Sequence, residues 1–315
     1  MPISDRIQHS TIATLVLAAL VVFAGCGMPF SGGNGGTTEP TVTPMNVPTD
    51  EPTPTPVPQL APGLKGTDVT DPFTLAEAHA SVLNGSSYTL HRNLTVRYAN
   101  GTIYTQQTLD AQLAANRTRY YLVGNYSGVP VNGEQVTVKT YSDGERVLEA
   151  RIVNGDRTYN TIHIPGQESA AAREVLPANL VGDEQIYSLF SAVETRVLNE
   201  TTLNGTKRYR IIAANVSGEA NFRNQYGDPQ NATASARIDS RGFVREYSYR
   251  YNGTVDEADV TVINRVQYTE IGSTTVERPP WYDTATENTS TATPTERRSD
   301  TAVSALINSY RSGVG

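Results

Sequence analysis

The residue types that most often do chemistry in proteins show no shared spacing in this sequence. His79, His91 and His163 have none of the spacings of metal ligands. The sequence patterns of zinc peptidases, serine hydrolases, phosphate-binding loops and dinucleotide-binding folds do not occur either. His79 falls in an expected helix and is interpreted as a core or boundary residue, whereas His91 is expected in solvent. The sequence therefore predicts no catalytic site, no metal site and no cofactor, and hence a protein that is not an enzyme.

An acidic cluster, Asp256, Glu257 and Asp259, lies near a predicted turn. Carboxylates this close together could hold a cation, which is one interpretation of the cluster. Calcium loops, however, need a glycine and more oxygen ligands at set positions. A solvated acidic turn is therefore the favoured interpretation, and a cation site is the alternative.

One residue carries a definite chemical expectation: Cys26, the only cysteine of the chain. It follows a short polar segment with Arg6, an apolar stretch from Ile12 to Phe23, and the small residues Ala24 and Gly25. The apolar stretch is shorter than the roughly 20 residues that a membrane-spanning helix needs. This arrangement predicts a signal peptide over the residues before Cys26. A lone cysteine also excludes an internal disulfide framework.

Residues 23–26, Phe-Ala-Gly-Cys, resemble the lipobox of lipoproteins, although Phe23 stands where Leu or Val is usual. The resemblance implies that Cys26 carries a thioether-linked lipid and becomes the mature N-terminus. A lipid with two chains supplies the two signals that stable anchoring needs. We therefore expect attachment to the cell membrane, with the chain facing the exterior. The alternatives are an ordinary cleaved signal followed by a chance cysteine, and an uncleaved signal anchor.

N-glycosylation sequons are the second sign of export, because Asn-x-Ser/Thr has meaning only on an exported surface. The pattern occurs eleven times. Asn-Gly-Thr is also a good hairpin turn, which is an alternative explanation for several of the matches. The candidate sites are Asn84, Asn93, Asn100, Asn116, Asn125, Asn199, Asn204, Asn215, Asn231, Asn252 and Asn288.

Composition narrows the setting further. The net charge of −7 argues against nucleic acid as a partner. The chain has only three lysines, Lys65, Lys139 and Lys207, so nearly all its positive charge is arginine. This acidic, lysine-poor and threonine-rich composition resembles that of proteins from halophilic archaea.

Three regions follow the signal. Residues 26–64 hold Cys26 and a Thr/Pro-rich segment that is expected to be an extended spacer, reaching on the order of 100 Å. Residues 65–283 are expected to form one folded domain, and residues 284–315 a disordered, Thr-rich tail. Within the domain, Asp71-Pro72 begins a predicted helix that ends at Asn84-Gly85.

A period of two then predicts a half-buried strand over residues 88–98, in which only Arg92 breaks the apolar set. A second helix is expected at about 182–193. The fold class predicted is α+β, mainly antiparallel, with a strongly curved, half-barrel-like sheet packed with two or three helices. Hairpin turns are expected at Asn100-Gly101, Asn132-Gly133, Asp143-Gly144, Asn154-Gly155, Asn204-Gly205 and Asn252-Gly253.

The order of these elements resembles the lipoprotein-carrier fold of LolA and the mycobacterial LprG-type lipoproteins. Residues 236–244, Ala-Arg-Ile-Asp-Ser-Arg-Gly-Phe-Val, are similar to a strand–Asp–Gly–strand hairpin found late in such domains. The resemblance implies a half-closed barrel that wraps helices around an apolar cavity. The signal, spacer and domain together also look like uncharacterised lipoproteins of haloarchaea.

Tyrosine is the most informative remaining side chain, with 17 tyrosines against six phenylalanines. Tyr247, Tyr249 and Tyr251 share one face of an expected strand and are the candidate lining of a partly wet cavity. Ordinary cross-strand packing is the alternative, and the favoured one. Two functions follow: a binding or carrier domain for a lipid or other apolar ligand, or a structural or interaction glycoprotein of the cell envelope, in contact with a surface layer. The first requires a continuous apolar cavity.

Overall fold

The computed structural model describes residues 56–162, 171–214, 226–227 and 229–290. The expected signal, Cys26, most of the spacer, His163, Asn215 and most of the C-terminal tail lie outside the described residues. No helix within the described ranges is long and apolar enough to cross a membrane.

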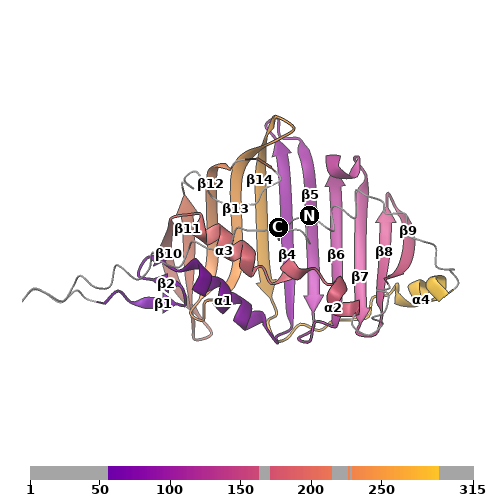
Figure 1. The fold of residues 1–315 in the computed structure, drawn as a ribbon, viewed down its shortest axis with the longest axis horizontal. Coiled ribbons are helices and arrows are strands. Elements are labelled where there is room, and N and C mark those ends of the chain that lie inside the picture. The colour runs from indigo at the N-terminus through magenta and orange to yellow at the C-terminus, as the bar shows by residue number, and fades with distance from the viewer. Residues whose placement is uncertain (1–55, 163–170, 215–225, 228, 291–315) are drawn as a thin grey trace, which may run out of the picture. The chain divides into compact units, whose positions relative to one another are not determined.

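Eleven antiparallel strands form one open, curved sheet (Figure 1), which confirms the predicted fold class. Strand β14 pairs with β4, so the end of the domain completes the sheet beside its first long strand. Strands β10 and β9 are the two edges, which leaves the sheet unclosed. In spatial order the strands are β10 (Thr195–Leu203), β11 (Thr206–Ala214), β12 (Gln230–Asp239), β13 (Val244–Val255), β14 (Ala258–Thr269), β4 (Tyr88–Tyr98), β5 (Ile103–Leu113), β6 (Arg119–Gly128), β7 (Gln135–Asp143), β8 (Val147–Val153) and β9 (Asp156–Ile162).

Helices α1 (Pro72–Leu83), α2 (Ala171–Val175) and α3 (Asp183–Ser191) cross one face of the sheet over its lower half, as Figure 1 shows. We call this the inner face and the opposite one the outer face. Helix α1 begins where predicted, because the Asp71 carboxylate accepts a hydrogen bond from the Thr74 N–H at 3.0 Å. Its C-terminal end is held by Arg117, whose guanidinium donates to the Leu83 carbonyl at 2.7 Å.

The alternation along each strand sorts side chains between the two faces. On β4, Leu90 and Val96 are buried on the inner face, whereas His91 and Asn93 are exposed on the outer face. Helices α1 and α3 pack against the inner face through residues such as Leu75 and Phe190. The space between helices and sheet is filled by large side chains that are almost completely buried: Tyr88, Tyr120, Phe243 and Tyr268.

One predicted turn is wrong. Asn252-Gly253 lies inside β13, and the chain reverses instead at Asp256 and Glu257, whose φ values are 47° and 68°. Gly253 has a different role, because a Cβ there would lie 2.1 Å from the Tyr226 carbonyl oxygen. The glycine is required by the close approach of another segment, and two acidic residues adopt the left-handed conformation of the turn.

The folded region also extends beyond both predicted limits. A small sheet of β1 (Gln59–Ala61), β2 (Leu64–Lys65) and β3 (Asp68–Val69) begins within the expected spacer. It is ordered because Ala61 and Leu64 are buried in the main core. At the other end, α4 (Tyr282–Ser290) is a helix over residues for which the sequence predicts a disordered tail from position 284.

Helix α4 is held on the outer face of the sheet at its β7–β9 end. Trp281 and Ala285 are buried there against Tyr141 of β7 and Leu148 of β8. The Tyr282 hydroxyl donates a hydrogen bond to the Asp143 carboxylate at 2.6 Å. Elsewhere the outer faces of β4, β5, β13 and β14 keep a polar and largely exposed set of side chains.

Candidate binding site

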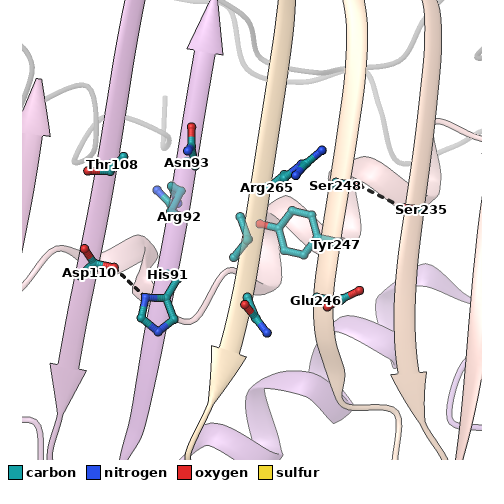
Figure 2. A pocket seen from close by; sticks show the side chains of 12 residues that line it. His91, Arg92, Asn93, Thr108, Asp110, Ser235, Glu246, Tyr247, Ser248 and Arg265 are labelled. Carbon is teal, nitrogen blue, oxygen red and sulfur yellow. Dashed lines mark hydrogen bonds and ion pairs between the residues drawn. The ribbon is translucent and has the colours of Figure 1, made fainter. Parts of the chain in front are cut away.

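The outer face carries a shallow groove of about 540 Å³ across five neighbouring strands, from β12 to β5. Figure 2 views it from the side opposite the helices, with His91 and Asp110 on the left strands and Glu246 on the right. The polar side chains along it are His91, Asn93, Thr108, Asp110, Ser235, Glu246, Ser248, Arg265 and Gln267.

The groove is lined by two rows of side chains that run across the strands. One row contains Glu246, Gln267, His91 and Asp110, and the other contains Ser235, Ser248, Arg265, Asn93 and Thr108. In one row, His91 is paired with Asp110 at 2.6 Å, and further along Arg237 is paired with Glu246 at 3.2 Å. These ion pairs are exposed, so each contributes little to stability. Charges of both signs, such as Arg265, Glu246 and Asp110, lie along the groove, so no single charge there selects a ligand. The expectation that His91 lies in solvent is confirmed.

The inner face has a different organisation, because polar side chains interrupt it between two apolar clusters. The lower cluster lies under α1 and α3 and includes Leu90 and Tyr268. The upper cluster includes Val96, Tyr251 and Val262. Between them lie two adjacent cross-strand rows, which we call the polar belt. One row runs Tyr249, Asn264, Leu94, Gln107 and Tyr126, and the other runs Tyr247, Val266, Arg92, Leu109 and Gly124.

Asn264 is the most informative member of the belt. Its side chain is 7% exposed. Gln107, which flanks Leu94 on the other side, is 4% exposed. A buried amide needs a hydrogen bond, because leaving it unpaired costs roughly 1–3 kcal/mol.

The helix layer adds a second polar group to the belt. Arg92 donates a hydrogen bond from Nη2 to the backbone carbonyl of Asn179, at 3.3 Å. Asn179 belongs to the 3₁₀ turn η2 (Ala178–Leu180) that precedes α3. Its side-chain Oδ1 is buried and has no protein partner. The belt thus has hydrogen-bonding groups from both the sheet and the layer above it.

The three tyrosines proposed to line a cavity do not share one environment. Tyr247 is 2% exposed and belongs to the lower cluster, and Tyr251 is 1% exposed and belongs to the upper cluster. Both are core residues. Tyr249 is half-buried, contacts both clusters and lies directly opposite Asn264. Tyr247 and Tyr249 thus both lie in the belt rows, and of these two only Tyr249 is half-buried.

The two hollows characterised in the described region both open on the outer side of the strands, at the groove and above it near Asn252 and Thr261. Neither lies between the helices and the sheet. Under α1 and α3, the tyrosine and phenylalanine rings of the lower cluster fill the layer between helices and sheet.

His79 is a structural residue of the lower cluster, as the sequence predicted. The Val244 N–H donates to Nδ1 at 3.2 Å, and Nε2 lies 2.9 Å from the Val181 carbonyl, so the neutral ring carries its proton on Nε2. Burial lowers the pKa of His79 to about 4, against a partial rise caused by the Val181 carbonyl. The ring stacks on Phe243 and meets the edge of Tyr268.

The sequon asparagines avoid the inner face. All ten that fall in the described ranges are exposed, at turns, at helix ends or on the outer side of strands. Asn93 and Asn125 stand on either side of Thr108 in one outer row. Glycosylation of these sites stays a prediction.

The acidic residues at 256–259 occupy the β13–β14 turn. Within the residues that the structure covers, they belong to no group of three or more His, Cys, Asp or Glu side chains able to hold a metal ion. The alternative of a cation site therefore has no structural support. Polar inner-face positions were the hardest to predict from the sequence: Arg92 is visible there as a break in the alternation, whereas Asn264 and Gln107 give no such signal.

Comparisons with known proteins add the following. No curated protein matches the sequence. Among solved structures, LprF from Mycobacterium bovis is similar at 12% identity over 68% of this chain and 99% of that one, with a TM-score of 0.35. A DUF1329 family protein from Desulfovibrio piger is similar at 10% identity over 67% and 95%, with a TM-score of 0.23.

Rv2717c from M. tuberculosis is similar at 11% identity over 62% of this chain and 97% of that one, with a TM-score of 0.19. At such TM-scores these likenesses carry no weight for function, and the fold rests on the strand order described above. The sequence itself matches a family model over residues 11–285, and the chain belongs to that family of unknown function, DUF7537.

Proposed function

We propose that this chain is an exported, lipid-anchored surface protein whose domain binds an amphiphilic molecule at the polar belt of its inner face. The observation that carries the proposal is the set of polar side chains between two apolar clusters, with Asn264 at 7% exposure and the buried Asn179 Oδ1 that has no protein partner. An amphiphile has the same division, with a polar group beside an apolar body. Its polar group would meet the belt, and its apolar body would lie against the half-buried Leu94 and Tyr249.

A polar side chain on the inner face costs more free energy than one on the outer face. The outer groove is a solvated surface on which polar side chains are the rule. A buried amide on an apolar face is costly unless a partner satisfies it. A ligand that supplies this partner gains a hydrogen bond in a low-dielectric setting, where such bonds are stronger than in water.

The exterior location is supported by features of the sequence. Cys26 follows an export signal, and a Thr/Pro-rich spacer separates it from the domain. The ten exposed sequon asparagines are compatible with a glycosylated outer face. That distribution also favours a second candidate function, in which the outer face of a structural glycoprotein contacts other components of the cell envelope.

Binding is tested by native mass spectrometry of the full-length Cys26→Ser chain, in which the predicted anchor is removed. We expect an additional, exchangeable mass and saturable binding of a fluorescent fatty-acid analogue. Asn264→Leu should weaken this binding about fivefold or more, since one hydrogen bond is worth about 1 kcal/mol. Arg265→Leu changes the neighbouring residue on the outer face and is the matched control. Equal loss in both variants, or no binding at all, would contradict the proposal.

The anchor has a separate test. Cys26→Ser should move the protein from the membrane fraction to the medium, because the thioether lipid cannot form. Unchanged membrane retention of this variant would show that another segment holds the chain, and the lipid anchor would be abandoned while the binding proposal stood.

A further inference from the structure

We propose that a cluster of arginines on the outer face, at the end of the sheet where β12 turns into β13, binds a phosphate group, either as the free ion or as a monoester. This arginine cluster consists of Arg208 and Arg210 of β11, Arg237 of β12, Arg241 of the β12–β13 turn and Arg245 of β13. It lies on the face opposite the polar belt, so the proposed amphiphile and the proposed phosphate are independent of each other. The rest of the outer groove carries charges of both signs, whereas here one sign predominates.

The alternation along β11 places two of the arginines. Tyr209 and Ile211 are buried in the lower cluster of the inner face. Arg208 and Arg210 therefore point to the outer face. On the neighbouring strand, Arg237 lies directly opposite Arg210. Like charges in opposite positions of adjacent strands destabilise a sheet, and an anion between the two guanidinium groups would replace this repulsion with attraction.

Asp239, the carboxylate opposite Arg208, is already fully occupied by other donors. Its side chain is completely buried. Its two oxygens accept from the backbone N–H groups of Arg241 and Phe243, at 3.0 and 3.4 Å, and from the guanidinium groups of Arg241 and Arg245, at 2.8 and 3.4 Å. A carboxylate has about four acceptor positions, so none is left for Arg208. The Nε of Arg208 is buried and has no partner.

A β-bulge brings a further positive charge to this place. Arg245 is the extra residue of β13, because its neighbours Val244 and Glu246 pair with successive residues of β12. Burial lowers the pKa of Arg245, and the charge of Arg208 lowers it further, in opposition to the attraction of Asp239. The two guanidinium groups therefore lie close enough to repel each other. An anion beside them would be attracted by both.

The other carboxylates near the cluster have cationic partners. Glu246 of β13 lies 3.2 Å from the Nε of Arg237. Glu200 of β10 lies 2.7 Å from the Nζ of Lys207. Neither is available to a second arginine without giving up the pair that it forms.

The two arginines of β11 are thus left without a counter-charge. The β10 residues opposite Arg208 and Arg210 are Thr201 and Asn199, which are uncharged. Neither arginine forms an ion pair with any residue that the structure describes. Two unmatched positive charges fit a phosphate monoester, which carries about −1.5 to −2 charges at pH 7 and three acceptor oxygens. Because the chain has a net charge of −7, this concentration of arginine does not follow from its composition.

A single phosphate is within reach of three of the guanidinium groups. Residues two apart on a strand are separated by about 6.7 Å, and neighbouring strands by about 4.8 Å. Arg208, Arg210 and Arg237 therefore surround one point above β11 and β12. Arg237 uses its Nε for Glu246, and its other N–H groups stay available to an oxyanion.

The test is calorimetric titration of the full-length Cys26→Ser chain with sodium phosphate at pH 7, with sodium chloride keeping the ionic strength constant. We expect saturable binding of one phosphate per chain and a melting temperature that rises with the bound fraction. Arg210→Gln changes an exposed side chain and should weaken phosphate binding about tenfold, because charge-assisted hydrogen bonds are lost. Arg250→Gln is the matched control, since it removes an exposed outer-face arginine that lies further along β13, opposite Thr233. This control should leave the affinity unchanged.

Two further probes identify the source of the phosphate group. Binding of glycerol 3-phosphate as tightly as inorganic phosphate would support a soluble ligand. Cosedimentation with phosphatidylcholine vesicles only when they contain phosphatidic acid, lost in Arg210→Gln and kept in Arg250→Gln, would support a lipid headgroup.

Two results would overturn the phosphate site. One is binding that chloride matches at equal ionic strength, with no preference for phosphatidic acid vesicles. The other is equal weakening by Arg210→Gln and Arg250→Gln, which would show that net charge alone is responsible. Neither result bears on the polar belt, because binding of the fluorescent fatty-acid analogue by the same protein tests that site separately.

Discussion

Each central strand supplies side chains to both faces of the sheet, but a polar side chain has a different environment on each face. On the outer face of β4 and β14, polar residues such as His91 and Arg265 are exposed to solvent, and His91 contacts Asp110 of β5. On the inner face, Arg92 and Asn264 interrupt an otherwise apolar surface. A polar residue is ordinary in the first setting and costly in the second. The inner face is therefore the more informative place to look for a ligand.

The contrast has one exception, at the β7–β9 end of the sheet. There the outer face is apolar and aromatic, and the segment around Trp281 and α4 covers it. Tyr121, Tyr141 and Tyr159 point to this side and contact either Trp281 or Tyr282. A sheet face is thus polar where it is open and apolar where the chain returns to bury it.

The largest expected effect separates the two faces at adjacent residues of β4. Leu90→Ala removes a completely buried side chain and should lower the free energy of unfolding by about 4 kcal/mol. His91→Ala removes half of an exposed ion pair and should lower it by less than about 1 kcal/mol. Urea unfolding followed by circular dichroism measures both. Similar losses of unfolding free energy in the two variants would contradict the assignment of Leu90 to a buried face and His91 to an exposed face.

The exception at β7–β9 gives the next effect. Trp281→Ala should lower the free energy of unfolding by about 3 kcal/mol, because it uncovers Tyr141 and Leu148. Trp281→Phe keeps an aromatic ring there and should cost less than about 1.5 kcal/mol. Trp281 is the only tryptophan, so its fluorescence reports this region alone. If that signal changes well before the sheet unfolds, the covering segment is an independent unit and not a part of the core.

Much of this fold could be predicted from the sequence because its signals are local. Asp71-Pro72 determines where α1 begins, and the period of two over residues 88–98 gives β4 and its two faces. The Asn252-Gly253 turn was predicted wrongly for a reason that is not local. Gly253 accommodates a distant carbonyl, and sequence alone does not show which glycines make a turn and which admit another segment.

The candidate site was harder to predict because it depends on strand order. Arg92 and Gln107 are brought together by the β4–β5 hairpin, whereas Asn264 is far away in the sequence and joins them only because β14 pairs with β4. The three tyrosines of β13 were correctly placed on one face, yet they do not share one environment: Tyr247 lies in the lower cluster, Tyr251 lies in the upper cluster, and Tyr249 contacts both. Helix α4 was missed because its burial comes from Trp281 and a strand surface more than a hundred residues earlier.

A buried histidine offers a pH-dependent test of the inner face. Burial lowers the pKa of His79 to about 4 from 6.5, so below pH 6.5 the unfolded chain binds a proton that the folded chain does not. Stability is therefore lost as the pH falls from 6.5 towards 4, by about 2 kcal/mol between pH 7 and pH 5. Unfolding curves at these two pH values measure the loss. The matched variant His79→Gln should lack this component, and an unchanged pH dependence in that variant would assign it to other groups.

The smallest effect belongs to the outer groove and tests whether its ion pairs are structural. The guanidinium of Arg237 lies 3.2 Å from the Glu246 carboxylate, and both side chains are more than a third exposed. Solvent screens such a pair and its two long side chains lose rotamer freedom when they form it, so Glu246→Ala should change the free energy of unfolding by about 0.5 kcal/mol or less. The change should shrink further in 1 M salt, where the screening length is about 3 Å. A loss above 2 kcal/mol that salt does not reduce would mean that Glu246 has a role inside the sheet, and the outer face would then need the same scrutiny of its polar residues as the inner one.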